Sequence, residues 1–188
     1  MKYKLLFFLI MIFNFNSFGQ LHSSVVVLKS GDTLKGLIGK LKTKTFIYKK
    51  YSKDSRKEIN FSQIESLKIR YSKNDIKEYR FFEIKDKNGF IAVRPSVIGT
   101  KAELYFIEKF EGFGGTNNYS IILEYYIKKS GEKKLTHLGK YDLLGTMRKN
   151  VLKYFTDCFS LIEKVKIREF RMKNGLEEIV NYYNGKCE

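Results

Sequence analysis

The chain of 188 residues contains only two cysteines, Cys158 and Cys187, and both lie close to its C-terminus. A cysteine pair can form a disulfide, contribute ligands to a metal site or supply a nucleophilic thiolate. Two free buried thiols are a further alternative. The choice between these chemistries depends on the compartment that the chain enters and on the elements that carry the two residues.

Histidine is the other residue type that could do chemistry, and the chain has His22 and His137. A Ser-His-Asp arrangement could be assembled from His137, Asp142 and a serine, but the G-x-S-x-G turn that exposes a nucleophilic serine is absent from the sequence. Possible metal ligands are dispersed, and the glycine-rich stretch 111–118 lacks the Gly-Lys-Ser/Thr of a phosphate-binding loop. We therefore expect no catalytic residue, no metal site and no cofactor.

The N-terminus has the layout of a secretory signal peptide. Lysines at positions 2 and 4 precede an apolar run from Leu5 to Phe13, and Ser17 and Gly19 are the small residues before a cut at Gln20. The alternative is a membrane anchor, but the nine apolar residues would cover only about 14 Å as a helix, against about 30 Å of hydrocarbon. We expect residues 1–19 to be removed, no transmembrane segment in the mature chain, and a periplasmic or secreted location.

The positive charge has two interpretations. The formal charge is +16, with 36 lysines and arginines against 20 acids. The first interpretation is a general compositional bias toward lysine that is unrelated to any partner. Lysine greatly outnumbers arginine and is scattered along the chain. The second is an anionic envelope component, such as lipopolysaccharide, phospholipid or acidic polysaccharide. Nucleic acid is not expected as a partner, because phosphate and base recognition favours the planar fork of arginine.

Residues 20–72 are predicted to form a small β unit. Short β-branched runs alternate with turn signals such as Ser-Gly-Asp at 30–32, and Gly36 and Gly39 stand where a strand must bend. The stretch VVLKSGDTLKGLIG, followed by INFSQIESLKI, resembles the small SH3-like or Sm-like barrels. That resemblance implies a small bent sheet or a barrel. We do not carry over RNA binding, because an exported chain meets little RNA.

Residues 73–140 are predicted to form an antiparallel β-meander. Hairpins are expected around Asn88-Gly89, a dipeptide typical of type I′ turns, and around Ser130-Gly131. Between Ala102 and Ile107, even-numbered and odd-numbered residues should lie on opposite faces of a strand.

Residues 141–188 change to a helical period. Apolar residues recur at helical spacings of three and four, namely Leu144, Met147, Val151, Leu152 and Phe155, and two further helical stretches follow. Cys158 would start one helix and Cys187 would follow the next, so an antiparallel helical hairpin would bring them together. Export supplies an oxidising compartment, and we therefore expect a Cys158–Cys187 disulfide.

Two stretches support a family resemblance. RFFEIKDKNGFIAVRPSVIGTKAELYFIEKF in the middle and VLKYFTDCFSLIEKV with EEIVNYYNGKC at the end resemble uncharacterised exported proteins common in Bacteroidetes. In that family a hairpin leads into a G-x-x-x-L-Y strand, a YF-x-D-C-P-x-L helix follows, and the chain ends near YN-x-x-C. Here Gly99 to Tyr105 matches with longer spacing, and Phe159 replaces the proline. The resemblance implies export and a fold, but no activity.

The sequence therefore predicts an α+β protein with a small bent sheet or barrel, an antiparallel meander and a C-terminal helical hairpin closed by a disulfide. The units are 20–72, 73–140 and 141–188, and 20–188 could be one domain. The expected function is that of an exported, non-enzymatic binding or envelope-accessory protein of unknown ligand. The alternatives are a basic anion-binding protein and an unrecognised hydrolase.

Overall fold

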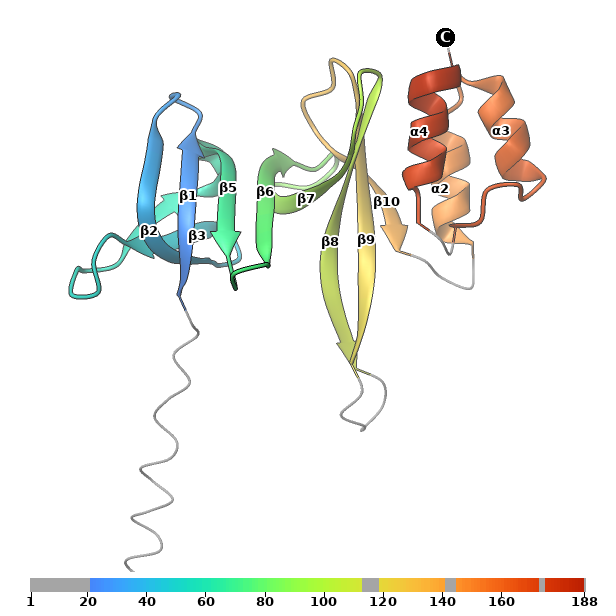
Figure 1. The fold of residues 1–188 in the computed structure, drawn as a ribbon. Coiled ribbons are helices and arrows are strands. Elements are labelled where there is room, and N and C mark those ends of the chain that lie inside the picture. The colour runs from blue at the N-terminus through green and yellow to red at the C-terminus, as the bar shows by residue number, and fades with distance from the viewer. Residues whose placement is uncertain (1–20, 113–118, 141–144, 173–174, 188) are drawn as a thin grey trace, which may run out of the picture.

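The computed structural model describes residues 21–112, 119–140, 145–172 and 175–187. In this part of the chain, ten strands form one open antiparallel sheet in the order β10-β9-β8-β7-β6-β5-β1-β2-β3-β4, with helices beside its β10 end (Figure 1). The strands are β1 (His22–Leu28), β2 (Thr33–Leu41), β3 (Thr45–Lys49), β4 (Lys57–Asn60), β5 (Ile64–Arg70), β6 (Ile76–Glu83), β7 (Phe90–Ile98), β8 (Ala102–Gly112), β9 (Tyr119–Lys129) and β10 (Thr136–Lys140).

The N-terminal strands form a strongly bent sheet that does not close. After β4, the short 3₁₀ helix η2 (Phe61–Gln63) turns the chain back, and β5 pairs with β1. The bend in β2 occurs at the expected glycines. Gly36 has φ +70°, and Gly39 lies so close to Phe46 that a Cβ would come 2.3 Å from its ring. The bent sheet is thus confirmed, while a closed barrel, the other form expected, is wrong.

The meander from β6 to β10 is confirmed, although its first turn differs from the predicted type I′ turn. The loop between β6 and β7 covers 84–89 and takes positive φ at Asp86 and Gly89. The reason is a distant contact. Ile84 forms a bridge with Leu135, which follows β9, and backbone hydrogen bonds join Leu135 to Glu83 and Lys85. These bonds widen the hairpin beyond two residues.

Strand β8 separates two cores, as the alternation predicts. Ala102 and Leu104 face a core shared with the C-terminal helices. Tyr105 faces the opposite side and packs in a smaller core with Val93 and Tyr126. A third core lies under the bent sheet and includes Phe46. Both faces of the central strands are therefore buried, by different partners.

Three helices cover one face of β8, β9 and β10 (Figure 1). They are α2 (Thr146–Tyr154), α3 (Phe159–Lys166) and α4 (Glu177–Lys186). Cys158 immediately precedes α3 and Cys187 immediately follows α4, and the two form a disulfide with Cα atoms 5.5 Å apart. The α+β class and the disulfide are confirmed. Of the helices in the described ranges, none has the length and apolar character needed to cross a membrane.

Candidate functional groove

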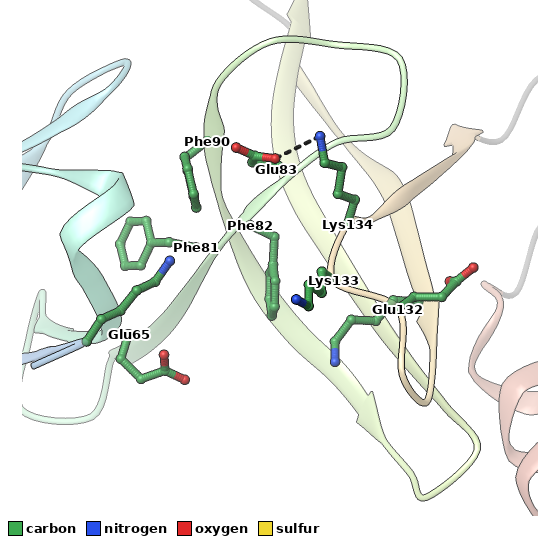
Figure 2. A pocket seen from close by; sticks show the side chains of 10 residues that line it. Glu65, Phe81, Phe82, Glu83, Phe90, Glu132, Lys133 and Lys134 are labelled. Atoms are coloured by element: carbon green, nitrogen blue, oxygen red, sulfur yellow. Dashed lines mark ion pairs between the residues drawn. The ribbon is translucent and has the colours of Figure 1, made fainter. Parts of the chain in front are cut away.

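A concave surface lies where the bent N-terminal sheet meets the meander. Two adjoining hollows, each of about 430 Å³, share Glu65, Phe82 and Lys128, and we call them together the central groove. Figure 2 shows the residues that line one of the two hollows. The remaining lining residues are Lys29, Glu78, Arg80, Phe81, Glu83, Phe90, Pro95, Ile98, Glu103, Tyr105, Glu132, Lys133 and Lys134.

The floor of the central groove is aromatic. Phe82 on β6 and Tyr105 on β8 have ring centroids 5.0 Å apart, and Figure 2 shows Phe82 in the middle of the groove. Tyr105 is only 3% exposed, so it supports the floor rather than covering a ligand. These rings point the same way because strand residues two apart, and residues paired across strands, share one face. The floor therefore follows from the alternation along the meander.

Most of the charged residues on the rims of the central groove form ion pairs. Arg80 lies 3.0 Å from Glu78, and Lys128 lies 3.0 Å from Glu103. On the other rim, Lys134 lies 2.9 Å from Glu83, the pair marked in Figure 2. The lining as a whole contains five basic and five acidic residues, so its formal charge is zero. The groove thus stays neutral in a chain whose total formal charge is +16.

Lysines also lie over the rings of the central groove. The Lys29 ammonium is 4.6 Å from the centroid of Phe90, and the Lys128 ammonium is 5.5 Å from that of Phe82. Such contacts attract a cation to the negative face of the ring. Lys133 is exposed and forms no ion pair with any described residue. It is the rim cation most readily available to a ligand.

Two titratable groups of the central groove, Tyr105 and Glu132, are held in their ordinary charge states. Burial, followed by the hydrogen bond to Glu103, raises the pKa of Tyr105 far above its usual value. Burial alone would raise the pKa of Glu132, but hydrogen bonds from Lys85, Tyr154 and the backbone of Lys129 together lower it. Glu132 therefore stays ionised and Tyr105 stays neutral near pH 7, and neither is set to exchange a proton there.

His137 does not lie in the central groove. Its Nε2 is 2.8 Å from Oε1 of Glu124 on the neighbouring strand, and its ring packs against Tyr126. Burial lowers the pKa of His137, while the Glu124 charge opposes that shift. Lys109 also pairs with Glu124, at 2.5 Å. The acid beside His137 is thus Glu124, whereas Asp142, considered from the sequence, lies outside the described residues.

The other candidates from the sequence are dispersed. His22 lies on β1 with its ring 4.5 Å from that of Tyr71, and the glycine-rich stretch 111–118 falls mostly outside the described residues. Within the described ranges, no group of three or more histidines, cysteines and carboxylates could hold a metal ion. The two cysteines are joined to each other, and neither lines the central groove.

The sequence did not single out the side chains that attach α4 to the sheet. The Asn184 side chain accepts hydrogen bonds from the backbone N–H of Lys101 and of Ala102, and donates one to the Ala102 carbonyl, at 2.9–3.0 Å. A Cβ on Gly99 would overlap Asn184. Gly99 belongs to the G-x-x-x-L-Y motif and Asn184 to the YN-x-x-C motif described above. The presence of both motifs in the chain was the only feature of the sequence that could have indicated this contact.

Two acids complete this attachment. Glu177 at the start of α4 accepts a 2.6 Å hydrogen bond from the Ser96 hydroxyl. Asp157 accepts bonds from Lys129, at 2.7 Å, and from the Tyr183 hydroxyl, at 2.6 Å. These contacts are explained by packing of the helices on the sheet. They leave the central groove as the candidate site.

Comparison of the chain with protein-family models, with curated proteins and with solved structures finds no match. A functional interpretation therefore depends on the chemistry of the molecule itself. The feature that carries that interpretation is the neutral, aromatic central groove.

Proposed function

We propose that the protein is an exported, non-enzymatic binding protein whose central groove holds an extended polypeptide segment that carries charges of both signs. The observation that carries the proposal is an aromatic floor flanked by rims with equal numbers of acidic and basic residues. Sites for ligands combine apolar contact area with a few polar groups that set orientation. Here the polar groups come as ion pairs, so they suit a ligand with alternating charges.

The lining supports a peptide better than a sugar or a polyanion. The faces of Phe82 and Phe90 already lie near lysine ammonium groups, so flat stacking of a sugar ring would have to displace them. A polyanion would meet five carboxylates in the groove. A peptide with both charges can exchange partners with the rim pairs while its apolar side chains contact the floor.

Two further observations support this function. The pKa shifts at Tyr105 and Glu132 stabilise their ordinary charge states, which suits a binding surface better than acid–base catalysis. The Cys158–Cys187 disulfide is compatible with an oxidising extracellular or periplasmic compartment. Cleavage of residues 1–19 belongs to the same proposal.

The proposal can be tested with synthetic peptides and fluorescence anisotropy. Peptides that alternate acidic, apolar and basic residues should bind more tightly than uniformly acidic or uniformly basic peptides of equal length. The double variant Lys128→Glu, Lys133→Glu should weaken the binding of the mixed peptides by about tenfold or more, since hydrogen bonds to charged groups contribute about 1.5–3 kcal/mol each.

The matched control is the double variant Lys149→Glu, Lys153→Glu on the exposed face of α2, which changes the net charge equally and should leave peptide binding unchanged. Equal binding of mixed and uniformly charged peptides would contradict the proposal. An equal loss in the groove variant and in the control would also contradict it, because net charge alone would then explain the binding.

A further inference from the structure

The excess positive charge gathers at the end of the sheet farthest from the helices. Residues 33–57, which form β2, β3 and the start of β4, contain eight lysines and one arginine against the single acid Asp54. Their formal charge is +8, half of the +16 of the chain. The helical segment 141–188 has nine basic residues but seven acids. We call residues 33–57 the basic end; it is separate from the central groove.

Internal ion pairs take up little of this charge. Among the described residues, Lys42 forms the one ion pair that involves a basic residue of the basic end, 3.8 Å from Glu58, with both side chains more than half exposed. An exposed pair at that distance contributes little. In the central groove, by contrast, three of the five basic residues, Arg80, Lys128 and Lys134, form ion pairs. The basic end is therefore available to a partner of opposite charge.

The loop between β3 and β4 presents this charge at a projecting tip. Every residue from Lys50 to Arg56 is exposed, and the loop extends away from the sheet in Figure 1. Asp54 holds the loop in shape. Its carboxylate accepts a 2.9 Å hydrogen bond from the Tyr51 backbone N–H, and its own N–H bonds to the Tyr51 carbonyl. The only acid in the basic end thus serves the loop conformation.

Tyr51 adds an amphipathic ring at the tip. Its side chain is 63% exposed, and the Lys50 ammonium lies 5.6 Å from the ring centroid. Tyrosine is enriched at the headgroup level of membranes, where its ring is in an apolar region and its hydroxyl is in water. Clustered lysines are attracted to anionic lipids and gain about 1 kcal/mol each near the surface, a factor of about five in partitioning.

We infer that the basic end docks on an anionic phospholipid bilayer, with the 50–56 loop at the headgroup level and Tyr51 inserted among the headgroups. Lysine suits such a surface because its flexible stem and compact charge can follow mobile headgroup phosphates. The scarcity of arginine argues against a partner with phosphates in fixed positions, such as nucleic acid. This docking is independent of what the central groove binds.

The first test is flotation of the exported protein with vesicles of equal parts phosphatidylglycerol and phosphatidylcholine, with pure phosphatidylcholine vesicles for comparison. The triple variant Lys50→Gln, Lys53→Gln, Arg56→Gln should bind the anionic vesicles about a hundredfold more weakly. The matched control Lys149→Gln, Lys153→Gln, Arg168→Gln removes the same charge from exposed positions of the helical segment. It should weaken binding at most a few-fold.

The second test uses the absence of tryptophan from the chain. Tyr51→Trp places a single fluorophore at the tip, and its emission should shift to the blue and resist iodide quenching when anionic vesicles are added. Phe159→Trp, at a position on α3 that is 77% exposed, should show neither change. These readouts do not require removal of any charge.

Three results would overturn the inference. One is an equal loss of vesicle binding in the triple variant and its control, which would indicate net charge alone. Another is no blue shift for Tyr51→Trp on vesicles that bind the protein. The third is loop-dependent binding of heparin or DNA without binding to vesicles, which would indicate a different polyanion.

Discussion

The contact between Asn184 and the start of β8 should be one of the most important single side-chain contacts for stability. Its amide pairs with both the N–H and the carbonyl of Ala102, as a neighbouring strand would, and also accepts from the N–H of Lys101. Ala102 is 1% exposed, so water cannot replace both of these partners. Each buried backbone group left without a partner costs about 1–3 kcal/mol.

Asn184→Ala should therefore lower the free energy of unfolding by about 2–4 kcal/mol. The two backbone groups of Ala102 lose their partners, while alanine returns about 0.5 kcal/mol through its higher helix propensity in α4. Asn184→Asp should fall between the wild type and alanine. It keeps both acceptor bonds, but it loses the donor and places a carboxylate against the Ala102 carbonyl.

The assay is urea denaturation followed by circular dichroism, with the disulfide intact in every sample. Asn181→Ala is the matched control, because Asn181 is an exposed asparagine of the same helix. It should be neutral or slightly stabilising. If Asn184→Ala and Asn181→Ala differ by less than about 0.5 kcal/mol, the reasoning from buried unpaired groups is refuted.

Three other predictions concern stability. Replacing both Cys158 and Cys187 by alanine should lower the free energy of unfolding by about 3.5 kcal/mol, because the disulfide links residues that are 29 positions apart in the sequence. Urea denaturation of the variant checks this value, and an unchanged midpoint of unfolding would contradict it. Gly39→Ala should cost about 2 kcal/mol in the same assay, because its Cβ would meet the Phe46 ring, whereas Gly185→Ala, with open space around it, should cost nothing. Burial alone would raise the pKa of Asp157, but bonds from its lysine and tyrosine partners lower it. The stabilisation by ionised Asp157 is therefore present above about pH 4 and is lost as the pH falls through the folded-state pKa. Asp157→Asn should make the free energy of unfolding, measured by urea denaturation at several pH values, fall less steeply below about pH 4. An unchanged fall in this acid range would show that these bonds do not contribute to stability.

Features carried by neighbouring residues could be predicted from the sequence. The bend at Gly36 depends on a residue that tolerates positive φ, and the two faces of β8 follow from strict alternation. The helical period after residue 144 and the pairing of the two cysteines are also local or compositional properties. The type of the 84–89 turn was missed because Leu135, about fifty residues away, determines it.

The central groove could not be predicted for the same reason. Its lining comes from the turn after β1, from β5, β6, β7, β8 and β9, and from the loop after β9, so no window of sequence contains it. The pairing that neutralises it also depends on packing. Glu103 and Lys128 become partners only because β8 and β9 align them across the ladder.

The sequence by itself determined the strand and helix periods, the turn glycines, the number of cysteines and the excess of lysine, because these depend on residue type and short spacing. The tertiary structure decided that the sheet stays open, that Asn184 attaches α4 to β8, and that the charges lining the central groove balance to zero. Those outcomes depend on contacts between residues far apart in the chain, and only folding brings such residues together.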